Sequence, residues 1–124
     1  MTEEEILEEI TDIAGFCEVT YDQTNGEELS ERLTNLNVYL ARTAQLEVEA
    51  TALYNARLAD VTIRIADIYK TFGATERKNI ANGEISTHKK LVELCERLNK
   101  TIVHSIDGIR SQLSYLKTMK EKNQ

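Results

Sequence analysis

The chain has 124 residues, the usual size of one domain and too short for two separately folded cores. It contains no Pro or Trp and only 6% aromatic residues, which argues against turn-rich sandwiches and barrels and favours packed helices. The net charge is −6 at pH 7, and no apolar run approaches the roughly 18 residues that a membrane-spanning helix requires.

The first predicted element is a short helix over residues 1–18. Thr2 followed by Glu5 forms a capping box. One side of the helix is apolar: Ile6, Leu7, Ile10, Ile13, Ala14 and Cys17. The acidic start of the chain is unlike the basic start of a signal peptide, so we expect a cytoplasmic protein.

A connector after residue 18 leads into a much longer helix over residues 27–71. Thr24 followed by Glu27 offers a second capping box, and the predicted helix contains neither Gly nor Pro. Its apolar positions recur at helical spacing: Leu29, Leu33, Leu36, Leu40, Tyr54, Leu58, Val61, Ile65 and Ile68. Such a helix is roughly 65 Å long, too long to be buried in one compact chain. Glu47 falls near the centre of the stripe, which indicates a phase shift or bend near residues 45–50.

A second apolar stripe lies on the opposite side of this helix: Ala52, Ala56, Ala59, Ile63 and Ala66. An ordinary solvent-facing side would carry charged residues there. Small residues at this spacing allow another helix to approach closely. We therefore expect neighbours on both sides of this segment.

The sequence next predicts a connector over residues 72–87. Gly73 suits the C-terminal cap of the long helix, and the Asn-Gly pair at residues 82–83 suits a turn. Ser86 or Thr87 can then cap the last helix.

The last helix, over residues 88–119, has the most regular apolar pattern. Its apolar positions alternate by three and four over nearly four heptads, as in a coiled coil. Six of them are the expected core or subunit contacts: Leu91, Leu98, Ile102, Ile109, Leu113 and Leu116. Residues 120–124 are expected to fray. We predict one all-α domain over residues 1–124, an antiparallel hairpin of two long helices plus the short N-terminal helix, completed by oligomerisation.

The two halves of the chain carry opposite charge. Residues 1–56 have 13 Asp and Glu against two Arg, whereas residues 57–124 have eight Asp and Glu against 13 Lys and Arg. The simplest interpretation is that acidic and basic segments lie against each other, within the fold or between subunits. The alternatives are a basic surface for nucleic acid or an acidic surface that imitates it.

No residue pattern predicts catalysis, a metal ion or a cofactor. His88 and His104 are 16 positions apart, without a His or Glu four residues after either. Cys17 and Cys95 fall at apolar helix positions without zinc or CxxC spacing, and we expect both to be reduced core thiols. We expect a protein that is not an enzyme.

Two sets of residues are candidates for binding. Basic residues around the connector could form a cationic rim for a phosphate backbone: Lys70, Arg77, Lys78, Lys89 and Lys90, with Lys100 further along. A mixed face opposite the apolar stripe of the last helix could make directed contacts with a partner: Arg97, His104, Ser111 and Tyr115. An ordinary solvated face is the alternative for both.

Two parts of the sequence resemble small helical proteins of tailed phages and prophages, often encoded among genes for DNA recombination and replication. They are residues 36–44 with 47–52, and residues 98–104 with 109–115. A looser similarity is to the recombination mediators of large tailed phages, small ring-forming proteins that help load a recombinase on single-stranded DNA. The resemblance implies a homo-oligomer in the bacterial host cell, with single-stranded DNA or a recombinase as partner. No DNA-contacting motif is matched residue by residue.

Three hypotheses for function follow. The first is a non-enzymatic phage-type accessory protein that acts in DNA recombination or replication as a homo-oligomer. The second is an inhibitor of a bacterial defence protein, with the carboxylates of residues 3–31 imitating nucleic acid or binding a basic groove. The third is a structural oligomerisation module.

Overall fold

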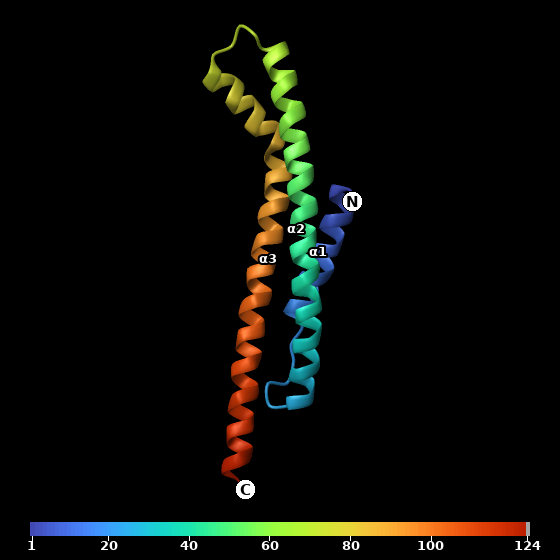
Figure 1. The fold of residues 1–124 in the computed structure, drawn as a ribbon, viewed down its shortest axis with the longest axis vertical. Helices are drawn as coiled ribbons and strands as arrows, with labels where there is room; N and C mark the ends of the chain where they lie inside the picture. Colours follow the sequence, from blue (N-terminus) through green and yellow to red (C-terminus); the bar gives the residue numbers. More distant parts are fainter. Residues whose placement is uncertain (124) are drawn as a thin grey trace.

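A computed structural model of the protein describes residues 1–123, which form three α-helices. They are α1 (Glu3–Glu18), α2 (Gly26–Ile68) and α3 (Ala74–Lys122). α2 and α3 run antiparallel and pack against each other, and α1 lies beside the middle of this hairpin (Figure 1). The predicted all-α fold, with two long paired helices and a short N-terminal one, is confirmed.

α1 begins and ends where its sequence predicts. The Thr2 hydroxyl accepts a hydrogen bond from the Glu5 N–H, and the Glu5 carboxylate accepts one from the Thr2 N–H, both at 3.2 Å. This reciprocal pair satisfies two backbone donors that a helix start leaves free. Ile6, Ile10 and Ile13 are buried, so α1 packs its isoleucine side onto the hairpin.

α2 is continuous over 43 residues, without a break near residues 45–50. Glu47 remains partly exposed, while Leu46 and Ala50 on either side of it are buried. The buried position falls at Leu46, one residue before Glu47, where the apolar stripe predicts it. The helix continues through this shift without a break. The N-terminal cap differs from the prediction, because the Asn25 side chain accepts from the N–H groups of residues 27 and 28. Thr24 instead donates to Asp22.

The predicted connector over residues 72–87 is wrong, since α3 already begins at Ala74. Gly73 precedes α3 as its N-terminal cap, with φ −66° and ψ 160°, and does not end α2. Residues 82–83 lie inside the helix because a single Gly without Pro weakens a helix without ending it. Ile85 is buried against the upper part of α2, and this packing holds the segment helical.

The upper part of α3 is tilted away from the rest of the helix (Figure 1). Near this bend the Ser86 hydroxyl donates to the carbonyl oxygen of Gly83 at 3.0 Å, so Ser86 does not cap a helix start as predicted. A Gly and a Ser that bonds back to the preceding turn are recognised causes of helix bending. At its other end α3 continues to Lys122, and the predicted fraying of residues 120–122 is also wrong. Gln124 lies outside the described residues.

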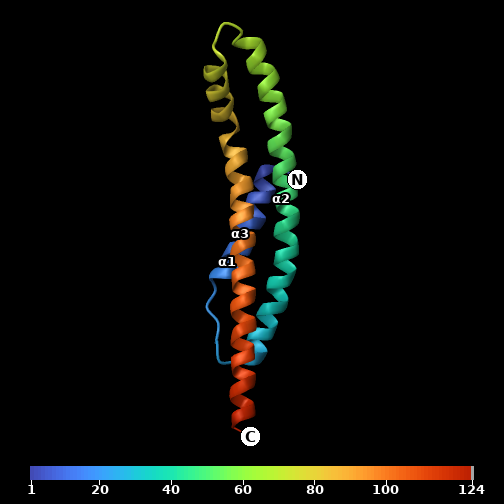
Figure 2. The same ribbon diagram turned by 60° about the vertical axis from the view of Figure 1, so that its left-hand side comes forward.

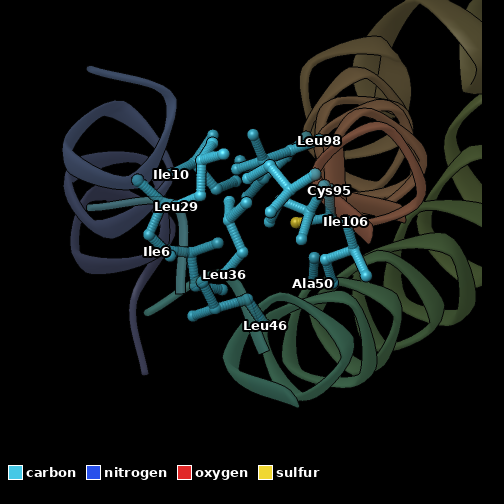
Figure 3. Close-up of a cluster of buried hydrophobic side chains, with 13 residues drawn as sticks. Ile6, Ile10, Leu29, Leu36, Leu46, Ala50, Cys95, Leu98 and Ile106 are labelled. Carbon is cyan, nitrogen blue, oxygen red and sulfur yellow. The ribbon is translucent and has the colours of Figure 1, made fainter. Parts of the chain in front are cut away.

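The core has two parts of unequal size. Where all three helices meet, isoleucines of α1 pack with leucines of α2 and with Cys95, Leu98 and Ile106 of α3 (Figure 3). Of the six predicted contact residues, Leu91, Leu98, Ile102 and Ile109 are buried there and Leu113 and Leu116 are partly buried. The upper hairpin consists of two helices alone (Figure 2). Its fully buried residues are Val61, Ile65 and Ile85.

Candidate interaction surfaces

The side of α2 opposite the core is exposed and uncharged. We call it the back face of α2 and define it by nine residues at spacings of three and four: Thr34, Val38, Ala41, Gln45, Val48, Ala52, Ala56, Ala59 and Ile63. All nine are exposed, as is Ala66, and Val38, Val48 and Ile63 are 63%, 68% and 72% exposed. Within residues 1–123 no helix covers this face, although the sequence predicts a neighbour for it.

A cationic groove lies on α3 just below the bend. It has a volume of about 480 Å³ and brings together Lys89, Lys90 and Arg97, with Tyr54 of α2 on its opposite side. Glu93 is the one carboxylate in its lining. Asn82 and Ser86 add polar groups at its upper end. We call this site the α3 groove.

The six cations predicted to bind nucleic acid are not gathered in one place. Lys89 and Lys90 share the α3 groove, whereas Arg77 and Lys78 line a separate groove between α2 and the start of α3. Lys70 is within 3.5 Å of Asp67 near the hairpin end. Lys100 is exposed ten residues beyond Lys90, about 15 Å along the helix.

The predicted mixed face is exposed along α3. Arg97, His104, Ser111 and Tyr115 all lie in solvent, and Tyr115 is 57% exposed. Their first member, Arg97, also lines the α3 groove. The groove and this face therefore form one continuous side of α3, which the sequence divided into two sets.

No protein-family model, curated protein or solved structure matches this chain. Among residues 1–123, His, Cys, Asp and Glu side chains do not gather in a group of three or more that could hold a metal ion. In the same part of the chain, none of the helices has the length and apolarity needed to cross a membrane.

The acidic half of the chain is not neutralised by ion pairs with the basic half. In residues 1–123 its carboxylates pair with Arg42, with the Met1 ammonium and with His88, but with no Lys or Arg beyond residue 56. Arg42 binds Glu9 through two nitrogens, at 2.5 and 2.6 Å, and this hydrogen bonding lowers the pKa of Glu9. Most of the acidic surface therefore stays available to another molecule.

A buried arginine connects α1 to α2. Nη2 of Arg32 donates to the carbonyl oxygens of Phe16 at 3.1 Å and Cys17 at 3.2 Å. Its guanidinium lies 4.8 Å from the ring centroid of Phe16 and 4.2 Å from that of Tyr21. The apolar pattern alone does not predict this contact, although Arg32 lies three residues after Leu29 and four before Leu36, in phase with the core.

The environments of the two cysteines and of His88 indicate that these residues have structural roles. Burial raises the pKa of Cys95 to about 11 and also raises the pKa of Cys17, so both thiols are protonated at neutral pH. Cys95 is buried, as predicted, whereas Cys17 is only partly buried. Nε2 of His88 lies 3.1 Å from Glu3 and connects the start of α1 to α3.

Proposed function

We propose that this chain is a non-enzymatic accessory protein that works as a self-associated helical assembly. The supporting observation is the size of its surface. The chain exposes 8416 Å², whereas a compact monomer of 14.1 kDa exposes about 6,700 Å². The difference, about 1,700 Å² per chain, is in the range that one subunit buries in an obligate oligomer.

The upper hairpin adds to this argument. Only three of the described residues in this region are buried, Val61, Ile65 and Ile85, and partly buried hydrophobic residues surround them. Arg64 pairs with Glu84 between the two helices, and within residues 1–123 no third helix packs there. Burial of so few side chains contributes only about 5–9 kcal/mol, which is small against the conformational entropy of ordering both segments. Contacts with another chain would supply the missing burial.

We further propose that the assembly acts in DNA transactions and that the α3 groove holds a phosphate backbone. Lys89, Lys90 and Arg97 supply three cations within one groove, and Tyr54 offers an aromatic ring beside them. Cations with a neighbouring aromatic ring bind single strands without much sequence preference. The resemblance to phage recombination proteins favours the same class of ligand.

The test measures anisotropy of a labelled single-stranded oligonucleotide at low and high salt, together with the mass of the protein. We expect binding that weakens steeply with salt and that Lys89→Glu with Lys90→Glu reduces at least tenfold. The matched control is Lys120→Glu with Lys122→Glu, which makes the same charge change at the far end of α3. Binding that survives the first pair, or that both pairs reduce equally, would contradict a site in the groove.

A second candidate function rests on the outer side of α1. Glu4, Glu8 and Asp12 recur every four residues, are exposed and form no ion pair in the described chain. Such a row of carboxylates could bind a basic groove of a host defence protein in place of nucleic acid. Replacing all three with Lys should then release a basic host protein that co-purifies with the chain. Retention of that protein would rule out this function.

A further inference from the structure

The back face of α2 has an order of residues that favours one particular partner. Its outer positions, 34, 38, 41 and 45 on one side and 52, 56, 59 and 63 on the other, are mirror images about a point between Val48 and Glu49. This point is close to the middle of α2, which runs from Gly26 to Ile68. A second α2 turned end to end therefore meets the first one over its whole length with the two faces in register.

We propose that the back face binds the back face of a second copy of this chain, antiparallel, about a two-fold axis near Val48. The proposal rests on the self-association proposed above and identifies its surface. In a two-fold interface each patch contacts the same patch of the other subunit, so complementarity requires only that the patch match itself. The mirror order of the eight outer positions provides that match.

Side-chain sizes agree with this register. Val38 in one copy lies opposite Ala59 in the other, and Ile63 lies opposite Thr34. A large residue thus faces a small one at each end, which allows two helices to interlock at close distance. Parallel pairing would instead place Val38 against Val38 and Ile63 against Ile63.

Charges at the two ends of the face agree as well. Glu27 and Lys70 are both exposed, Glu27 in the first turn of α2 and Lys70 two residues after its last residue, within 3.5 Å of Asp67. In the antiparallel register Glu27 of each copy is opposite Lys70 of the other, which gives two ion pairs about 65 Å apart. Parallel pairing would bring like charges together at both ends, so it is disfavoured.

The flanks of the face do not oppose this arrangement. Glu49 of one copy lies close to Glu49 of the other near the two-fold axis. The Met1 ammonium, 3.6 Å from Glu49, offsets the repulsion between these two carboxylates. The single chain exposes about 1,700 Å² more surface than a compact monomer of its mass. This excess is larger than the roughly 800 Å² that each partner buries in a standard interface.

Thiol cross-linking tests the register directly. In a Cys17→Ser background, with Cys95 left buried, Val48→Cys should cross-link to itself with a short bismaleimide. Val38→Cys alone and Ala59→Cys alone should not, because residues 38 of the two copies are about 32 Å apart along the axis. A mixture of these two variants should give the cross-linked pair. Cross-linking of Val38→Cys to itself, without a product from the mixture, would overturn the antiparallel register.

A second pair of variants separates this proposal from self-association itself. Ala52→Glu with Ala56→Glu should reduce the mass to one chain without loss of helix content, since both positions are exposed in the single chain and Glu suits a helix. The matched control, Thr101→Glu with Thr118→Glu on exposed positions of α3, should leave the mass unchanged. An oligomer that keeps its mass in the first variant would overturn the back-face contact and leave self-association standing. A single-chain mass for the unchanged protein would overturn both.

Discussion

Replacing Arg32 should detach α1 from the hairpin more than any change on the surface of α1. Arg32 is 8% exposed, and it donates two hydrogen bonds to the last turn of α1 while lying between two aromatic rings. The carbonyl end of a helix is negative, so the guanidinium also stabilises the helix dipole of α1.

The size of the effect follows from these contacts. Hydrogen bonds to a charged donor contribute about 1.5–3 kcal/mol each, and a cation over an aromatic ring about 0.5–2 kcal/mol. Burying a guanidinium with Nε unpaired costs about 1–3 kcal/mol and offsets part of this gain. We expect Arg32→Met, which keeps most of the side-chain volume, to lower the free energy of unfolding by about 2–3 kcal/mol.

Urea unfolding at one fixed protein concentration measures this loss, because the proposed self-association would make stability depend on concentration. Cleavage between residues 19 and 25 by a protease should accelerate at the same time. Arg32→Lys is the informative companion, since its ammonium can still donate to both carbonyls but cannot stack flat on Phe16 and Tyr21. A loss below about 0.5 kcal/mol in Arg32→Met would refute this reasoning.

Four further outcomes are expected. Thr43→Val should lower the free energy of unfolding by about 1–2 kcal/mol in urea, because the Asn99 amide loses the Thr43 hydroxyl oxygen, its acceptor at 3.0 Å. An interaction energy of zero between Thr43→Val and Asn99→Leu in a double-mutant cycle would argue against this hydrogen bond. Gly83→Ala and Gly108→Ala should each stabilise the chain by about 0.5–1 kcal/mol, because both positions lie in α3 with open space around the added carbon. Destabilisation by Gly83→Ala alone would indicate that residues 82–83 form a non-helical connector, as the sequence predicts. Arg42 lowers the pKa of Glu9 in the folded chain, so the pair stabilises the fold above the unfolded pKa and this contribution is lost as pH falls through the lowered folded pKa. Glu9→Gln should therefore flatten the fall in the urea midpoint between about pH 5 and pH 3, and an unchanged slope would show that the pair contributes nothing. At pH 8 a thiol reagent should modify Cys17 but not Cys95, whose pKa of about 11 and burial keep it protonated and covered; two rapidly reacting thiols would contradict the packing of α3.

Periodicity predicts the helices of this chain well because each core side is built from widely spaced apolar residues. The capping box at Thr2 and the three isoleucines after it place α1 correctly. The failures come from single residues whose effect depends on distant packing. Gly83 weakens the helix locally without ending it, and Ile85, which packs with Val61 and Ile65, stabilises the helix through this point.

The surfaces are harder to predict than the helices. The stripe that includes Ala52 and Ile63 was visible as a second apolar side, and its exposure is now clear. The sequence predicts a connector over residues 72–87, but α2 and α3 are joined by residues 69–73 alone, so Lys89 and Lys90 lie within α3 and away from Lys70. Arg32 was overlooked because a charge at a core position is interpretable only when its ring and carbonyl partners are known.

Small-angle X-ray scattering from the unchanged chain tests the central claim most directly. The antiparallel contact along α2 predicts twice the 14.1 kDa chain mass, with a longest dimension close to that of one chain, since α3 alone is about 73 Å long. A single-chain mass at every concentration, or a doubled mass with a doubled length, would contradict it.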